Sequence, residues 1–483
     1  MVPKKKFARL PGKLVFIGFG SVGQGLLPLL LRHLTVVRSS ILIITADERG
    51  AEEASRYGIR FAVNPLTPGN YRAVLEPILQ PGDFLLNVAI GVSSVALIEL
   101  CQSRGALYLD SCIEPWEGGY TDARLLPSQR SNYAMRELAL ALNKRRRDGP
   151  TAILTHGANP GLVSHFVKHA LLDIARATRL KVKKPDSREK WAALAEKLGV
   201  KVIHVAERDT QSANPPKRVG EFVNTWSVDG FAGEGCQPAE LGWGSHEAQL
   251  PPDGRRHESG CGSAIYLQRP GASTRVRTWT PGGGPLHGFL ITHGESISIS
   301  DYLTVRDGEQ ARYRPTVFYA YHPCDAAVLS IDELAGNTWK QQAQSRVLMD
   351  DIDDGADELG VLLMGHAKGA YWFGSVLSVH EARKLAPYSN ATTLQVTSSI
   401  LAAIVWAIEN PRRGVVDPDE MDFERALEIA RPYLGRLVGA YSSWTTRRPR
   451  PAVPGRRRQQ RPVAVQEFPR GLSGAKVTSS PPA

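Results

Sequence analysis

The chain has 483 residues, which is too long for one hydrophobic core and predicts two or three domains. A hydrophobic content of 42% with 22% charged residues is typical of a globular protein and argues against a disordered chain. No uninterrupted apolar run of about 18 residues is present, and the basic start MVPKKKFARLPGK lacks the apolar core of a secretory signal, so we expect no membrane span and a cytoplasmic location.

The formal net charge of +11 is concentrated at the chain ends. Residues 447–483 contain nine Lys or Arg against the single acid Glu467, and four more basic residues lie within the first nine, so the body between them is nearly neutral. We predict a disordered basic tail over 446–483, because it is rich in Pro, Arg and Ser and poor in apolar residues. Such a tail can bind acidic surfaces or nucleic acid, but a solvated appendage is the simpler interpretation, and we expect no nucleic-acid partner.

Residues 13–155 alternate short apolar runs with amphipathic stretches. The runs read as buried parallel strands because they are apolar without alternation, and the stretches between them have helical spacing. We therefore predict a Rossmann-type, doubly wound parallel sheet over residues 1–155. The predicted strands are 14–18, 41–45, 59–63, 84–90, 106–110 and 151–155.

A glycine-rich turn follows the first predicted strand and opens a predicted helix. Its motif G-x-G-x-x-G is typical of a dinucleotide site, where the glycines allow a tight turn, close approach of the pyrophosphate and close packing of the helix. Asp47, two residues after the second strand, is the candidate for the ribose hydroxyls and favours NAD, although Arg49 nearby weakens that preference over NADP. The predicted cofactor-binding residues are Gly18, Gly20, Ser21, Val22, Gly23 and Asp47.

After residue 156 the rhythm of the sequence changes to helices and short β-type runs with Gly/Pro turns. This pattern predicts a mixed α+β domain over 156–375 for substrate binding, catalysis and dimerisation. Residues 376–445 read as a helical segment that packs back on the first domain. The five cysteines lie far apart with no zinc-type spacing, so we predict no metal and no disulfide.

Several short stretches of the second domain crowd acids together with aromatic residues. Carboxylates beside Trp and Tyr suit a polyamine, because ammonium groups gain ion pairing and cation–π attraction once water is displaced. Each residue taken singly also fits a structural role, such as a capped turn or a satisfied buried His. The stretches are HGANPG (156–161), HVAERDTQ (204–211), NTWSVDGF (224–231), EGCQPAELGWG (234–244), THGESIS (292–298) and YAYHPC (319–324).

From about residue 13 to 444 the chain resembles the bacterial homospermidine synthases, which are related to the saccharopine dehydrogenases. The resemblance rests on many stretches in order along the chain, which together are more specific than any one motif. They are GFGSVG, SNYAMRE, GANPGLVSHFVKHAL, IHVAERDTQ, FVNTWSVDGF, EGCQPAELGWG, SGCGSAIYL, RPGASTRVRTW, THGESISISDYLTVRD, YAYHPC, DELGVLL, NATTLQV and PYLG.

This resemblance implies an enzyme that joins two putrescines, or putrescine and spermidine, into sym-homospermidine. In that reaction NAD takes a hydride from the carbon beside an amine, a second amine exchanges into the imine, and the same cofactor reduces the product. The reaction has no net redox change, so the cofactor must remain bound. The resemblance also implies a homodimer.

The resemblance further places Asn159, Glu207, Glu234 and His293 around the reacting amine, with Trp226 facing the cationic intermediate. With an unperturbed pKa of about 6.5, His293 is expected to shuttle protons near neutral pH. Glu207 and Glu234 would bind the amine and relay protons, and Asn159 would orient them. Glu114 and Asp357 are expected to bind the distal amine, Asp357 being the weaker candidate because its acidic run reads as a solvated loop.

Four positions depart from the family pattern, and two of them, Gly294 and Met364, are less informative than Gly91 and Thr45. Gly91, in the stretch NVAIGVSS, stands where a carboxylate for the outer amine is expected, and Thr45 stands where an Asp is expected at the ribose. A lost ion pair at a desolvated amine is worth about 1.5–3 kcal/mol, which changes amine preference without abolishing catalysis.

Three interpretations therefore remain open. The first is an active homospermidine synthase with weaker outer-site binding, helped by Glu114 and Asp357. The second is a divergent saccharopine- or carboxynorspermidine-dehydrogenase-like NAD(P) oxidoreductase acting on another amine. The third is a binding protein that keeps NAD for structure only. The retained inner-site acids favour the first, since a carboxylated substrate would call for Arg residues instead.

Overall fold

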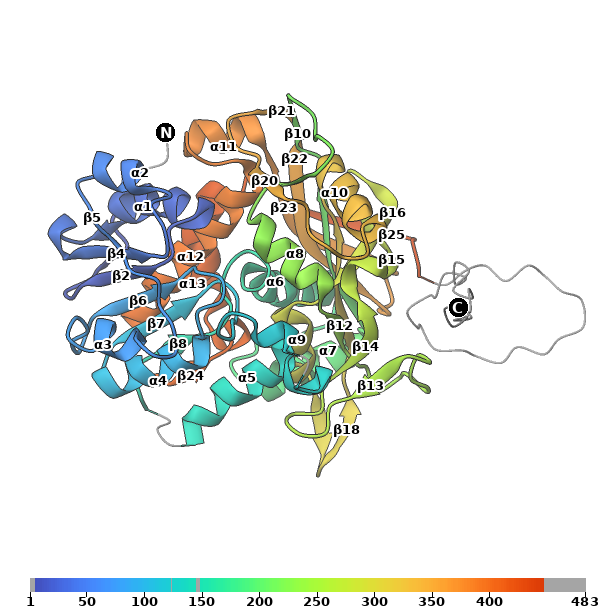
Figure 1. Cartoon of the computed structure of the whole chain (residues 1–483). Coiled ribbons are helices and arrows are strands. Elements are labelled where there is room, and N and C mark those ends of the chain that lie inside the picture. The colour runs from blue at the N-terminus through green and yellow to red at the C-terminus, as the bar shows by residue number, and fades with distance from the viewer. Residues whose placement is uncertain (1–4, 123, 145–147, 447–483) are drawn as a thin grey trace, which may run out of the picture.

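The computed structural model describes residues 5–122, 124–144 and 148–446. The basic tail predicted for 446–483 lies outside this range except for Thr446. Figure 1 shows two layered units side by side, one built around a blue parallel sheet and the other around a larger green-to-orange sheet. Their helices meet between the two sheets.

The first sheet has seven strands, all paired in parallel. Its central strand β2 (Leu14–Ile17) lies between β4 and β6, so the chain winds outward in both directions and confirms the Rossmann-type prediction. Outward on one side are β4 (Ile41–Thr45) and β5 (Arg60–Val63), and on the other β6 (Phe84–Asn87), β7 (Leu107–Asp110), β8 (Ala152–Ile153) and β24 (Val415–Val416). The associated helices are α1 (Ser21–His33), α2 (Ala51–Arg56), α3 (Tyr71–Leu75), α4 (Ser94–Arg104) and α5 (Asn132–Ala141).

The second sheet has ten strands and mixed pairing, which confirms the predicted α+β architecture. At its centre, β9 (Val202–Asp209) pairs in parallel with β19 (Thr316–His322) and antiparallel with β22 (Ala356–Met364). The remaining strands are β12 (Pro238–Gly242), β13 (Gly254–Arg256), β14 (Ala264–Pro270), β15 (Arg275–Thr280), β16 (Gly284–Ile291), β23 (Ala370–Ser378) and β25 (Arg436–Ser442). Its helices are α6 (Leu162–Ala177), α7 (Arg188–Leu198), α8 (Val228–Cys236), α9 (Gly294–Tyr302) and α10 (Asp325–Gly336).

Four short strand pairs lie outside the two large sheets in the described residues. They are β1 (Ala8–Arg9) with β3 (Leu34–Thr35), β10 (Ser212–Ala213) with β21 (Ile352–Asp354), β11 (Glu221–Asn224) with β20 (Gln344–Val347), and β17 (Val305–Asp307) with β18 (Gln310–Tyr313).

The C-terminal segment contributes to both units. Its helices are α11 (Val379–Leu385), α12 (Ala391–Glu409) and α13 (Phe423–Ala430), and α12 packs against α1 of the Rossmann-type unit. Strand β24 then adds an edge to the first sheet, while β25 pairs with β23 of the second. The expected helical character of residues 376–445 therefore fails at β24 and β25, because pairing with the edges of β8 and β23 decides the conformation of these short runs.

Helix α12 is long and apolar enough to cross a membrane by composition, with a mean hydropathy of 1.6 over its 18-residue window. Thr, Gln and Ser interrupt its sequence, ATTLQVTSSILAAIVWAIE, so it is not the uninterrupted apolar run that the sequence was expected to lack. Since 89% of the window is buried within the protein, α12 is a core helix whose apolar faces are covered by neighbouring elements.

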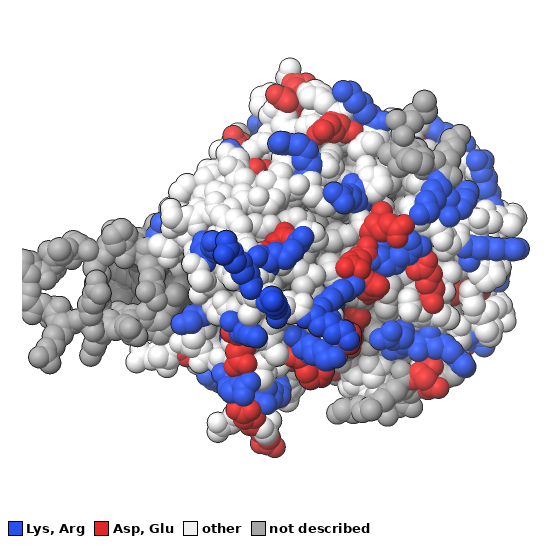
Figure 2. Space-filling view, turned by 180° about the vertical axis from the view of Figure 1, so that it is seen from behind, with Lys and Arg blue, Asp and Glu red and all other residues white. Residues whose placement is uncertain are grey.

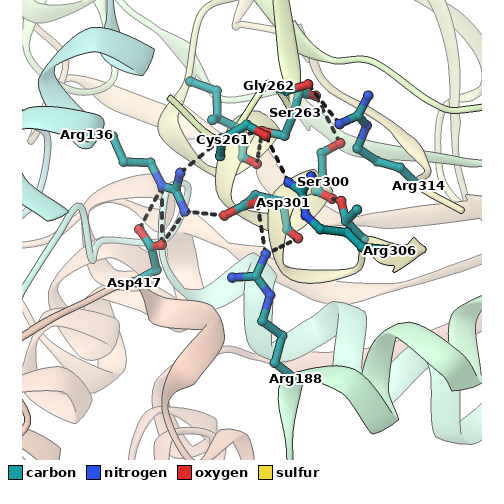
Figure 3. A network of polar contacts seen from close by, with 12 residues as sticks. Arg136, Arg188, Cys261, Gly262, Ser263, Ser300, Asp301, Arg306, Arg314 and Asp417 are labelled. Atoms are coloured by element: carbon teal, nitrogen blue, oxygen red, sulfur yellow. Dashed lines mark hydrogen bonds and ion pairs between the residues drawn. The ribbon is translucent and has the colours of Figure 1, made fainter. Parts of the chain in front are cut away.

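A buried ion-pair network joins four parts of the chain (Figure 3). Arg136 on α5 donates to Asp417, which follows β24, and to Asp301 on α9. Arg188 on α7 pairs with the other oxygen of Asp301 at 2.8 Å. Burial alone would raise the pKa of Asp301, but the two guanidinium groups hold it below its usual range.

On the surface, basic and acidic side chains are interspersed over the face shown in Figure 2.

Candidate active site

The glycine-rich turn between β2 and α1 has the geometry of a phosphate cradle. Gly18 has φ +85°, and a side chain there would collide with the backbone of Ala89, so the turn approaches the β6–α4 loop closely. A Cβ at Gly20 would meet open space, and one at Gly23 would press on the ring of Phe19. Helix α1 begins at Ser21, followed by Val22, and has no side-chain cap, so its first backbone amides at the carboxyl edge of the sheet can bind an anionic group.

The predicted ribose acid, Asp47, lies in the loop after β4 and is paired with Arg49. The guanidinium of Arg49 lies 2.7 Å from the Asp47 carboxylate, and its backbone N–H also donates to that group. These hydrogen bonds hold the pKa of Asp47 below its usual range. The carboxylate of Asp47 is thus already engaged by a basic neighbour.

The chain passes from the Rossmann-type unit to the second through a strained residue, Thr155. Its φ of +48° is unusual for a β-branched side chain. The carboxylate of Asp110, at the end of β7, accepts the Thr155 N–H, and the Asp110 carbonyl accepts the N–H of His156. Asp110 therefore fixes the start of the loop that carries Asn159 toward the second sheet.

Glu207 lies on β9 at the centre of the second sheet and is 2% exposed. Its carboxylate accepts hydrogen bonds from Asn159 Nδ2 at 2.8 Å and from the Tyr319 hydroxyl at 2.6 Å. Glu207 lies opposite Tyr321 of β19, and Tyr319 is two residues earlier on the same strand. Because side chains two residues apart share a face, this register brings all three to the helix-covered side of the sheet.

The sequence predicts a solvated loop around Asp357, and this prediction is wrong. Asp357 lies at the start of β22 and has no exposed surface. Pairing of β22 with β9 places it opposite Asp209 and beside Glu207. One Asp357 oxygen accepts from Thr392 Oγ1 at 2.7 Å, whereas the other is buried with no partner. Burial and the neighbouring acids Glu207 and Asp209 raise the pKa of Asp357 well above its usual range. Burial likewise raises the pKa of Glu207.

His293 caps the start of α9 and is 4% exposed. Its Nε2 lies 2.9 Å from Glu234 of α8, its Nδ1 lies 3.3 Å from Glu295, and its ring stacks on Tyr319. Burial alone would lower the His293 pKa, but the two carboxylates outweigh it and raise the pKa to about 10. The pKa of His293 thus lies above the unperturbed value of about 6.5, and its place between two acids favours the imidazolium form.

Trp226 lies between β11 and α8 and forms an aromatic wall of the cluster. Its indole N–H donates to the Tyr321 hydroxyl at 3.3 Å, and its ring packs on Phe231. Tyr321 in turn stacks on Tyr319. A cation placed against this wall would face π-electron density on one side and the carboxylates on the other.

Glu114 follows β7 and lies against the position that departs from the family pattern. Its Oε2 accepts the backbone N–H of Gly91 at 3.4 Å. Burial, together with the charges of Glu234 and Asp110, raises the pKa of Glu114 to about 8. Gly91 has φ +72°, and a Cβ there would be in ordinary contact with Glu117. Glu114 thus occupies the approach to the inner site where the expected carboxylate of residue 91 is missing.

The structure brings Asn159, Glu207, Glu234, His293 and Asp357 into one cluster, with Glu114 and Trp226 at its border. Three further participants were not singled out from sequence: Tyr319, Glu295 and Cys112, whose thiol contacts Glu234. Tyr319 and Glu295 lie within the stretches YAYHPC and THGESIS, which the sequence marks as rich in acids and aromatic residues. No sequence pattern marks Cys112. Among the described residues, no group of three or more His, Cys, Asp or Glu is arranged to hold a metal ion.

Two family models together cover most of the chain. Residues 14–153 match the saccharopine dehydrogenase NADP binding domain, and residues 157–441 match the saccharopine dehydrogenase C-terminal domain. The chain is 51% identical over 452 residues to a homospermidine synthase of Blastochloris viridis, covering 92% of this chain and 94% of that protein. It is 47% identical to a homospermidine synthase of Mesorhizobium japonicum, with the same coverage.

Solved structures agree with these matches. A crystal structure of the homospermidine synthase from Legionella pneumophila in complex with NAD superposes with a TM-score of 0.86 at 49% identity, covering 92% of this chain and 94% of that one. Saccharopine dehydrogenase from Saccharomyces cerevisiae matches at a TM-score of 0.50 and 10% identity, over 89% of this chain and all of that one, which extends the likeness in fold alone.

Proposed function

The chain belongs to the homospermidine synthase family, and we propose that it is an NAD-dependent enzyme that joins two putrescines, or putrescine and spermidine, into sym-homospermidine. One observation carries the proposal. Glu207, Asp357, Glu234 and Glu114 line one site, and no Lys or Arg among the described residues forms an ion pair or hydrogen bond with any of them. His293 supplies one positive charge beside Glu234, and a diamine would supply positive charge to the other acids of the cluster.

The residues of the β2–α1 turn fit NAD, because Gly20 leaves open space for the pyrophosphate and the α1 amides face it. When bound there, NAD supplies the acceptor and later the donor of the hydride. Asp47 would accept hydrogen bonds from the ribose hydroxyls. Its carboxylate would then bind the ribose and Arg49 at the same time. The contact between Cys112, two residues beyond β7, and Glu234 of α8 brings the acidic cluster to the carboxyl edge of the first sheet, where the nicotinamide of a Rossmann-type protein lies.

An ammonium group must lose a proton before its neighbouring carbon can release hydride. Glu207 suits this task because burial raises its pKa toward the working pH, and Asn159 and Tyr319 fix its carboxylate. His293, charged between Glu234 and Glu295, can return a proton to the departing ammonia or diamine. Trp226 stabilises the iminium cation formed between these two steps.

The outer site is weaker than the family pattern implies. Glu114 has a pKa of about 8, so much of it is neutral at pH 7 until an ammonium group binds beside it. With Gly91 providing only a backbone N–H, the distal amine is left with one carboxylate on this side. We propose that this weakens putrescine binding and changes the preference among polyamines rather than the reaction.

The competing proposal is an oxidoreductase for a carboxylated amine, which the saccharopine dehydrogenase domains favour. Such a substrate would require a cation for its carboxylate, and the inner cluster offers acids. Arg208, the basic residue next to Glu207 in sequence, lies on the other face of the sheet near Glu358. The acidic lining therefore supports a polyamine.

Incubating the purified protein with NAD and putrescine, without added reductant, tests the proposal by mass spectrometry. Homospermidine formed without net NADH supports the synthase. With putrescine deuterated at the carbons beside nitrogen, the product should retain the transferred deuterium, because the same cofactor returns it. Steady accumulation of NADH would support a dehydrogenase, and neither product nor NADH would support a binding protein.

We further propose that the enzyme acts as a homodimer in the cytoplasm. We propose that its functions are divided among a nucleotide-binding region 1–155, a substrate and dimerisation region 156–375, and a C-terminal segment 376–445 that joins them. Light scattering of the purified protein tests the dimer, since a monomeric mass at micromolar concentration contradicts it.

A further inference from the structure

We propose that Cys112 is a positioning residue that holds the carboxylate of Glu234 in place across the junction of the two units. This inference rests on the proposed function, because it concerns the same acidic cluster. The Cys112 thiol lies after β7 of the Rossmann-type sheet and donates to Glu234 Oε1 at 3.7 Å, a normal length for a sulfur donor. The other oxygen, Oε2, is held by His293 at 2.9 Å.

The thiol can serve only as a donor here. Burial raises its pKa well above the usual range, and the charges of Glu234 and Glu114 add to this effect, so it stays protonated. A thiol has one proton, and the alternative acceptor, the Ile113 carbonyl, is farther away at 3.9 Å and carries no charge. The S–H bond is therefore directed at Glu234.

This arrangement fixes Glu234 from two sides. His293 and Glu234 both belong to the second unit, so their mutual hydrogen bond does not align them with the nucleotide-binding unit. Cys112 supplies that alignment from the carboxyl edge of the first sheet. Because a thiol is a weak donor, it orients the carboxylate while leaving it able to interact strongly with His293 and the substrate amine.

The chain offers matched controls among its five free thiols. Cys236 also lies on α8, two residues after Glu234, but it is exposed and contacts none of the acids. Cys261 is half-buried and contacts Ser263 and Arg136. Cys236→Ser therefore controls for loss of a thiol near Glu234, and Cys112→Ser keeps a donor at the tested position.

The infrared S–H stretching band tests the contact itself and needs no turnover. Subtracting the spectrum of Cys112→Ser from that of the parent isolates the Cys112 band. We expect it at lower frequency than the Cys236 band, and we expect Glu234→Gln to shift it upward, because a neutral amide is a weaker acceptor. A Cys112 band that does not move in Glu234→Gln overturns the inference, even if the parent enzyme proves to make another product.

Kinetics test the consequence once the parent has been shown to form homospermidine. We expect Cys112→Ala to lower kcat about threefold to tenfold, with little change in NAD affinity or melting temperature, and Cys112→Ser to recover at least half of the loss. Cys236→Ser should retain the parent kcat. The inference fails if Cys112→Ala keeps the parent kcat, or if Cys112→Ser is as impaired as Cys112→Ala.

Discussion

Substituting Gly91 by Asp should tighten binding of the distal amine. The backbone there has φ +72°, which Asp tolerates better than most residues, and the new Cβ would lie 3.4 Å from Glu117, an ordinary contact. The hydrogen bond from the Gly91 N–H to the Glu114 carboxylate uses only the backbone of residue 91, so the substitution retains the donor. The variant thus adds one carboxylate at the mouth of the cluster with little rearrangement.

The size of the effect follows from the local charges. Because Glu114 has a pKa of about 8 and is largely neutral at pH 7, the new Asp carries the negative charge without strong opposition. A charge-assisted bond to a desolvated ammonium contributes about 1.5–3 kcal/mol, or roughly a 10- to 150-fold lower KM for putrescine. The left-handed backbone costs about 1 kcal/mol of folding stability, but it is the same in free and bound enzyme and leaves KM unaffected.

The assay is steady-state formation of homospermidine at pH 7 as a function of putrescine concentration. Gly91→Asn is the matched control, since it has the same shape and backbone strain without the charge. We expect Gly91→Asp to lower KM and Gly91→Asn to leave it near the parent value. Equal KM values for the two variants, with both folded, would refute the electrostatic reasoning.

Three more predictions concern residues of the site and its frame. Since the His293 pKa of about 10 in the folded state exceeds the unfolded value of about 6.5, its contribution to stability is complete below pH 6.5 and is lost as pH rises toward 10. Urea titrations of the unliganded protein should show this decline, and His293→Gln should flatten it. Tyr319→Phe should lower kcat about tenfold by freeing the Glu207 carboxylate, whereas Tyr371→Phe, which removes a hydroxyl remote from the site, should retain the parent kcat. Arg136→Met should cost about 3–5 kcal/mol in chemical denaturation, because Asp417 stays buried without the Arg136 guanidinium and Asp301 keeps only Arg188; a loss below 1 kcal/mol would contradict that role.

Much of the first unit could be predicted from sequence because its strands are buried on both faces and read as continuous apolar runs. The observed β4 and β6 begin at the predicted residues 41 and 84, although β6 ends at Asn87, three residues earlier than expected. The run Val88–Ile90 continues the apolar pattern but forms the loop before Ser93 and α4. Hydrophobicity alone does not distinguish a strand end from a buried loop.

The acidic cluster was harder to predict because its geometry depends on strand register. Asp357 belongs to an acidic run in which Asp353 and Asp354 are exposed, and the pairing of β22 with β9 buries it beside Glu207. The charge of His293 likewise depends on Glu234, which reaches it from a separate helix. These contacts join residues that are far apart in sequence, so no local sequence pattern predicts them.

Strand β24 has a consequence for biosynthesis. The first strand of the parallel sheet begins at Leu14, but its edge strand β24 is formed by Val415–Val416, about 400 residues later in the chain. Helix α12, which covers α1, also lies in this late part of the sequence. During translation the amino-terminal half therefore emerges from the ribosome with an open sheet edge along β8, and it stays incomplete while the whole second unit is synthesised. The two halves mature together at the end of synthesis rather than one after the other.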